Sequence, residues 1–105
     1  MKTTRIPAIL AVILASAFCG AASAQQLKLM TGPQGGSWYP LGGAIQGIIE
    51  KNVPGTSVQV LPGAGISNVL GVQTGKAELG FGNAVSSYDG VRGHDPFKQK
   101  TDNVF

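Results

Sequence analysis

One stretch decides how this chain is interpreted: Thr31-Gly32-Pro33-Gln34-Gly35-Gly36-Ser37-Trp38-Tyr39-Pro40-Leu41-Gly42-Gly43. It follows a short apolar alternation and precedes an amphipathic run, so it predicts a loop between a strand and a helix. Gly35 and Gly36 allow a positive φ and let a ligand approach the backbone closely. Ser37 is suited to cap the helix, whose free N–H groups attract a carboxylate or phosphate. The alternative is a plain turn, in which the glycines serve only the turn and the aromatic residues belong to the core.

The first 24 residues have the pattern of a secretory signal peptide. Lys2 and Arg5 form a positive n-region, residues 9–18 an apolar h-region, and Ala22-Ser23-Ala24 a small-residue cleavage site. The pattern predicts export to a bacterial periplasm, with a retained N-terminal anchor as the alternative. Cys19 would leave with the signal, so the exported product would contain no thiol, disulfide or cysteine metal ligand.

Charge and residue types exclude several functions. Removal of Lys2 and Arg5 lowers the net charge by two, from +3 to +1, and the remaining charges are mixed and dispersed. We find no basic stripe of the kind that nucleic acid requires. His94, the only histidine, is expected in an exposed loop, and the carboxylates are scattered. The sequence therefore predicts a protein that is not an enzyme, has no catalytic residues, binds no metal and needs no cofactor.

Strands and helices alternate along the chain. The predicted strands run from Leu27 to Thr31, from Ser57 to Leu61 and from Glu78 to Gly82. Short loops between strands and helices imply parallel pairing with right-handed crossovers. The predicted fold is therefore α/β, built from a parallel βαβαβ unit. In such sheets ligands bind at the carboxyl ends of the strands.

Two helices connect these strands. The first is predicted to turn Leu41, Ile45, Ile48 and Ile49 inward and Gln46, Glu50 and Lys51 toward water. It stops at the segment 52–55, where Asn52 is suited to a left-handed cap position. The second begins near Ile66, and Gly75 terminates it.

Three loops leave the carboxyl ends of the strands: Gly32–Tyr39, Gly63–Asn68 and Asn83–Tyr88. All are rich in Gly, Ser or Asn, which offer backbone N–H groups and short polar side chains. In the second loop, Ser67 Oγ and the Asn68 amide are predicted to donate hydrogen bonds to a ligand, and the alternative makes Ser67 a helix cap. A dinucleotide fingerprint is not favoured, because Asn68 replaces its last glycine. Together the loops predict a site for a small anion.

The opening stretch resembles the first loop and helix of the TAXI-family solute receptors of TRAP transporters. The resemblance continues through Asn52-Val53-Pro54-Gly55, Pro62-Gly63-Ala64-Gly65-Ile66-Ser67-Asn68-Val69 and Gly75-Lys76-Ala77-Glu78-Leu79-Gly80-Phe81, and covers nearly all of Gln25 to Gly93. It implies an extracytoplasmic receptor that delivers a solute to a sodium-coupled TRAP membrane permease subunit. It also implies a two-lobed type II periplasmic-binding fold and a small, often carboxylated solute, such as a glutamate-like amino acid or a dicarboxylate.

Carried onto this chain, the resemblance implies these ligand-facing positions: Gly36, Ser37, Trp38, Tyr39, Ser67, Asn68, Asn83 and Ala84. Residues 25–93 would form part of the first lobe, and residues 94–105 a polar irregular tail. Because family members are far longer, we expect a truncated fragment that is marginally stable and binds solute weakly or not at all alone. The alternative is a small exported interaction protein that contacts a permease or another subunit without binding solute.

Overall fold

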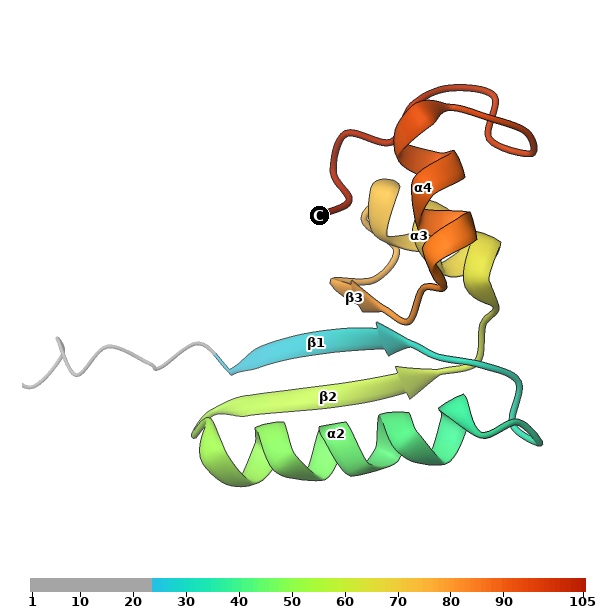
Figure 1. The fold of residues 1–105 in the computed structure, drawn as a ribbon. Helices are drawn as coiled ribbons and strands as arrows, with labels where there is room; N and C mark the ends of the chain where they lie inside the picture. The colour runs from blue at the N-terminus through green and yellow to red at the C-terminus, as the bar shows by residue number, and fades with distance from the viewer. Residues whose placement is uncertain (1–23) are drawn as a thin grey trace, which may run out of the picture.

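A computed structural model describes residues 24–105 (Figure 1), and the predicted signal peptide lies outside the described residues apart from Ala24. The element order is β1 (Gln25–Met30), α2 (Trp38–Asn52), β2 (Thr56–Leu61), α3 (Gly65–Gln73), β3 (Leu79–Gly80) and α4 (Ala84–Arg92). In this part of the chain we find no helix that is both long and apolar enough to span a membrane.

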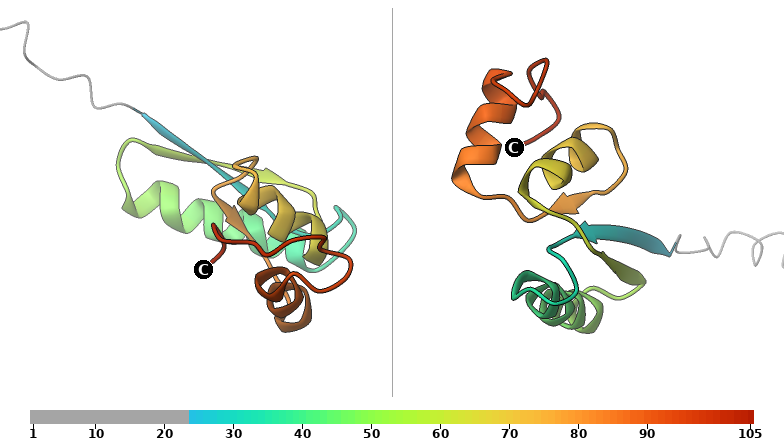
Figure 2. Two further views of the ribbon diagram at one scale, coloured as in Figure 1. Left: turned by 90° about the horizontal axis from the view of Figure 1, so that it is seen from above. Right: turned by 90° about the vertical axis from the view of Figure 1, so that its right-hand side faces the viewer.

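The strands form one three-stranded parallel sheet in the order β2-β1-β3. Leu27 pairs with Val58 across β1 and β2, and Leu29 pairs with Leu79 across β1 and β3. Helix α2 lies on one side of the sheet, while α3 and α4 lie on the other (Figures 1 and 2). The predicted α/β class with a parallel βαβαβ unit is confirmed.

Strand β3 is shorter than the predicted segment Glu78–Gly82. Its pairing with β1 extends beyond its ends, because Glu78 N–H donates to Lys28 O at 3.2 Å and Phe81 N–H to Met30 O at 2.9 Å. Glycine at positions 80 and 82 provides no side chain to pack, which weakens a strand. The regular strand is therefore only two residues long.

Asn52 does not take the predicted left-handed cap position. It remains in α2, and its side-chain Nδ2 donates to Ile48 O at 2.7 Å. The positive φ of this turn, 79°, falls on Gly55, which has no Cβ to oppose it. The helix stop was predicted at the right place, but the wrong residue was given the left-handed conformation.

Helix α2 does not face the sheet in the predicted way. Gln46 Nε2 donates to Val58 O, and Glu50 Oε1 accepts from Val58 N–H, both at 2.8 Å. These backbone groups belong to β2, which is an edge strand of the sheet. Gln46 and Glu50 therefore satisfy backbone groups at this open edge, which could otherwise pair with a strand of another chain. Because α2 turns Gln46 and Glu50 toward the sheet, Leu41 and Ile48 are 52% and 62% exposed, and the prediction that both point inward is wrong.

Replacing Glu50 by alanine is expected to lower the free energy of unfolding by about 1–2 kcal/mol, because Val58 N–H loses its acceptor. Lys51→Ala is the matched control on the exposed side of the same helix and should change stability by less than about 0.5 kcal/mol. Urea denaturation followed by circular dichroism measures both. Equal losses in the two variants would contradict the capping role of Glu50.

The region after Gly82 is more ordered than the sequence predicts. Helix α4 begins at the cap residue Asn83 and ends at Gly93, whose φ is +72°. Residues 94–105 form neither helix nor strand, as expected of the predicted irregular tail, yet Phe97 within them is only 2% exposed. The tail is also tied to α3, because Gln73 Nε2 donates to Asp102 at 2.6 Å and thereby lowers the pKa of that carboxyl.

Candidate functional site

Three loops meet at the carboxyl edge of the sheet, and in the structure they comprise residues 31–37, 62–64 and 81–83. Gly63 N–H donates to Gly32 O at 3.4 Å, which joins the first two loops. The rings of Trp38 and Phe81 meet edge to face, with centroids 5.8 Å apart, and join the first and third loops. The starts of α3 and α4 are also adjacent, since a β-carbon added at Gly65 would lie 2.8 Å from Asn83 Nδ2. The right-hand view of Figure 2 faces this edge.

We call this region the rim and define it as residues 31–39, 62–67 and 81–85. It contains the three loops and the first residues of α2, α3 and α4. The contacts confirm that the three loops share one edge, but the predicted bounds of the third are wrong, because Ala84 to Tyr88 belong to helix α4.

The rim holds a set of backbone N–H groups that have no backbone or side-chain acceptor within residues 24–105. The first N–H groups of a helix have no partner inside the helix and need one elsewhere. The groups concerned are those of Ser37, Trp38 and Tyr39 at α2, Gly65, Ile66 and Ser67 at α3, and Ala84 and Val85 at α4. They are amide hydrogens beside the partial positive charge of three helix starts.

No ionisable acid or base belongs to the rim residues, apart from the phenol of Tyr39. Beyond it, the Asp89 carboxylate lies 3.5 Å from His94 Nδ1, near the opposite end of α4. An anion at the rim would therefore meet amide hydrogens and no side-chain carboxylate from the rim residues. It would also lack an arginine or lysine from these residues, so main-chain hydrogen bonds would provide the attraction.

The first loop follows the prediction only in part. Neither Gly35 nor Gly36 has a positive φ, so that expectation is wrong. Gly36 N–H donates to Pro33 O at 2.8 Å and is therefore engaged in the turn rather than offered to a ligand. Ser37 occupies the predicted cap position, but its exposed side chain makes no capping bond.

The aromatic residues of the first helical turn line a shallow groove. Trp38 and Tyr39 are both half-buried. Trp38, with Leu41 and Ile45 of α2, faces the segment 80–82 across a groove of about 330 Å³. An indole beside the free amides provides apolar surface for the carbon chain of a solute.

Ser67 and Asn83 both serve the starts of their helices. The Ser67 hydroxyl accepts from Ala64 N–H at 2.9 Å and donates to Ala64 O at 3.0 Å, so it acts as the local cap that we kept as the alternative. Asn83 Oδ1 accepts from Ser86 N–H at 2.8 Å. Both residues are exposed, as is Ala84, the first residue of α4.

Asn68 differs from the other predicted site residues because it is 1% exposed. Its Nδ2 donates to Thr31 O at 2.7 Å and to Phe81 O at 2.8 Å, while its Oδ1 accepts from Ala64 N–H at 3.2 Å. The side chain is fully used inside the protein, so the predicted donation to a ligand is wrong. It lies beneath the rim instead.

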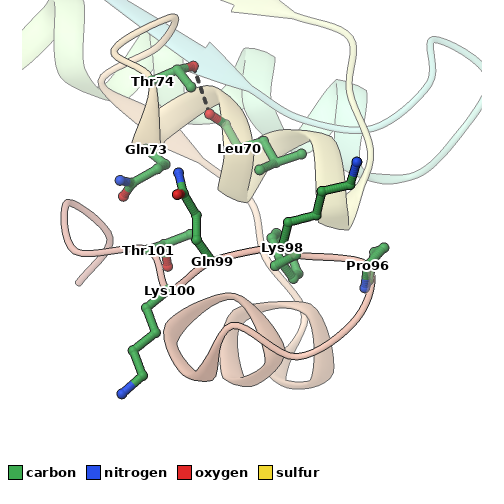
Figure 3. Close-up of a pocket in the computed structure, with 9 residues that line it drawn as sticks. Leu70, Gln73, Thr74, Pro96, Lys98, Gln99, Lys100 and Thr101 are labelled. Atoms are coloured by element: carbon green, nitrogen blue, oxygen red, sulfur yellow. Dashed lines mark hydrogen bonds between the residues drawn. The ribbon is translucent and has the colours of Figure 1, made fainter.

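A larger groove lies away from the rim, between α3 and the tail (Figure 3). It has a volume of about 510 Å³, and its lining includes Leu70, Phe97, Lys98 and Lys100. The side-chain amide of Gln73, which also lines it, is already bonded to Asp102 and Asn103. Because its lysines are exposed and its polar groups do not converge, this groove is a weaker candidate than the rim.

Among residues 24–105 no three His, Cys, Asp or Glu side chains gather in an arrangement that could hold a metal ion. The side chain of His94 is 57% exposed, and its Nδ1 lies 3.5 Å from Asp89 Oδ1.

Two residues under or within the rim make contacts that the sequence did not predict. Phe81 packs against Trp38, and its only signal was its position between two glycines after a strand. Thr31 is 0% exposed, and its hydroxyl donates to Leu61 O at 3.0 Å. Thr31 continues the alternation of Leu27 and Leu29 in the predicted strand, so its burial agrees with that pattern, whereas its hydroxyl bond to Leu61 O was not predicted.

Residues 29–104 match the NMT1-like family, which is of the periplasmic solute-binding type. The matched segment includes the whole rim and all three helices. No solved structure matches the chain.

Proposed function

This chain belongs to the NMT1-like family, and we propose that it is part of the TAXI-type receptor of a TRAP secondary transporter. In this proposal the chain captures a small carboxylated solute, such as a glutamate-like amino acid or a dicarboxylate, and delivers it to the membrane permease subunit. The observation that carries the proposal is the set of free amide hydrogens from three helix starts at one uncharged edge. Amides arranged in this way favour an anion.

The proposal places the protein in the periplasm after removal of residues 1–24, and it assigns no catalysis. The predicted signal peptide supports the location. The position of His94 and Asp89 outside the rim supports a binding role, since no histidine or side-chain carboxylate belongs to the rim residues and could serve a rim serine as general base.

We also propose that further protein completes this lobe in a working receptor. Leu41 and Ile48 of α2 and Leu79 of β3 are 52%, 62% and 39% exposed, and burial of such side chains would stabilise the fold. The second lobe would cover the solute, so the chain alone is expected to bind weakly. The same exposed side chains support the alternative function, a small exported protein that contacts a permease or another subunit.

Ala84→Pro tests the proposed site by removing a single amide hydrogen. Proline is tolerated at the first position of a helix, and the preceding Asn83 has φ −92° and ψ 160°, which suits a residue before proline. Loss of one hydrogen bond to a charged ligand is expected to weaken succinate binding about tenfold or more. Titrations followed by the emission of Trp38, the only tryptophan, measure the affinity.

Ala84→Ser is the matched control, because it keeps the N–H group and should bind succinate as the wild-type chain does. Succinamide, the neutral analogue, should bind neither variant. Equal affinity of the proline and serine variants, or equal binding of succinate and succinamide, would exclude the amide site. A wild-type chain that binds neither glutamate nor any dicarboxylate would favour the interaction protein.

A further inference from the structure

We propose that Asn68 is a positioning residue that holds the three loops of the rim in one arrangement. The predicted effect of Asn68 on solute binding depends on the proposed function, whereas its predicted effect on the order of the loops is independent of that function. The residue is 1% exposed and touches all three loops, so it links segments that are far apart in the sequence.

The hydrogen bonds of the Asn68 amide define its role. An Asn side chain carries two N–H hydrogens and one carbonyl oxygen. The two hydrogens point to Thr31 O at 2.7 Å, in the first loop, and to Phe81 O at 2.8 Å, in the third. The oxygen accepts at 3.2 Å from Ala64 N–H, in the second loop, which it shares with Ser67 Oγ at 2.9 Å. These partners also fix the orientation of the amide, because its opposite orientation would bring carbonyl oxygens together.

No other residue type of similar size can replace this set of bonds. Aspartate has no hydrogen to donate, serine has only one, and glutamine is longer by one methylene group. A buried carbonyl that loses its donor costs about 1–3 kcal/mol in general, so each loop carbonyl is strongly held to this amide.

Two glycines make room for the Asn68 side chain. A β-carbon at Gly63 would collide with Asn68 Oδ1, and one at Gly80 would lie 3.2 Å from Asn68 Cβ. The side chain is therefore enclosed between the second loop and β3. Its position leaves no freedom to move without moving those segments.

The consequence is a rim that is arranged before the solute arrives. Loops that must be ordered upon binding reduce affinity, because ordering costs conformational entropy. With Asn68 in place, the free amides at α2, α3 and α4 keep fixed relative positions. Without it, no single side chain would bond to all three loops. Thr31 N–H and Phe81 N–H would still bond to the sheet at 2.9 Å, but the first two loops would be joined by the 3.4 Å bond between Gly63 N–H and Gly32 O.

Two single variants, Asn68→Ala and its control Val69→Ala, test the proposal by comparison. Val69 is the next residue of α3, is 4% exposed, and packs against α4 at Gly90, so its loss destabilises the fold without touching the loop carbonyls. Both variants are compared at a temperature at which each is folded. ¹⁵N relaxation of the loop amides is measured without ligand, and succinate affinity is measured with Trp38 emission.

Asn68→Ala is expected to loosen the amides of residues 32, 34–37 and 82–83 and to weaken succinate binding about tenfold, as loss of an outer supporting partner does in other sites. Val69→Ala should leave loop order and affinity within about twofold. Equal loop order in the two variants would overturn the proposal. If the wild-type chain does not bind succinate, the proposed function fails, and the relaxation data alone still decide the role of Asn68.

Gly63→Ala provides the second variant if Asn68→Ala does not fold. The added methyl group would displace Asn68 without removing it, and its other close neighbour is Thr31 O in the first loop. The third loop is therefore reached directly through Asn68, and only indirectly from the first loop through the contact between Trp38 and Phe81. Altered order at Gly82 and Asn83 would support the proposal, and unchanged order there would overturn it.

Discussion

Replacing Phe97 by alanine is expected to lower the free energy of unfolding by about 3–5 kcal/mol. Phe97 lies in the irregular tail, yet it is 2% exposed and its ring approaches Gly90 of α4. Its N–H also donates to His94 O at 2.8 Å, which places the ring for packing. Because a small domain has only about 5–15 kcal/mol of stability, this loss would unfold a large fraction of the chain.

Phe105→Ala is the matched control for this prediction. It removes the same side chain from the same tail, but Phe105 is fully exposed, so stability should change by less than about 0.5 kcal/mol. Thermal unfolding followed by circular dichroism compares the two variants with the wild-type chain. If Phe97→Ala melts as the wild-type does, the tail is not part of the core.

Replacing Gly42 by alanine is expected to lower the free energy of unfolding by about 1–3 kcal/mol. The added β-carbon would collide with Thr31 Cγ2 and lie 3.2 Å from Val60 Cγ1. Gly42 is the buried residue of α2, so this is the point at which the helix approaches the sheet most closely. The collision outweighs the gain in helix propensity that alanine normally brings.

Gly43→Ala and Gly47→Ala should have the opposite sign. Neither glycine has an atom within 4 Å of an added β-carbon, and both are exposed on the same helix. Each substitution is expected to raise stability by about 0.5–1 kcal/mol, because alanine favours the helix. Chemical denaturation of the three variants measures the difference. Stabilisation by Gly42→Ala would contradict the close approach between α2 and the end of β1.

The order of the elements was predictable because it depends on local patterns. Alternating apolar residues marked β1 and β2, and the glycine segments marked the turns between them. Helix α4 was missed because its sequence, Ala84-Val85-Ser86-Ser87-Tyr88, has few strong helix formers and its cap Asn83 was assigned to a ligand instead.

The direction in which α2 faces could not be obtained from periodicity. Gln46 and Glu50 were assigned to water because they are polar, but the open edge of β2 supplies backbone partners for them. A helical pattern does not reveal that its neighbour is an edge strand with unpaired groups. That information depends on the strand order, which places β2 at the edge.

The candidate site was predictable as a place but not residue by residue. Parallel strands bring their carboxyl ends to one edge, so the meeting of the three loops followed from topology. Whether a polar side chain in such a loop faces solvent or the interior is decided by tertiary contacts. Asn68 was therefore assigned to a ligand, although three carbonyl and amide groups of the protein use its side chain.

The central claim is that amide hydrogens from three helix starts hold one anion. Amide NMR shifts of the chain during titration with succinate, and separately with succinamide, test it most directly. We predict that succinate causes its largest shifts together at residues 37–39, 65–67 and 84–85, the positions of the free N–H groups, and that succinamide does not. Shifts at only one of these segments, or in the groove between α3 and the tail, would contradict the claim.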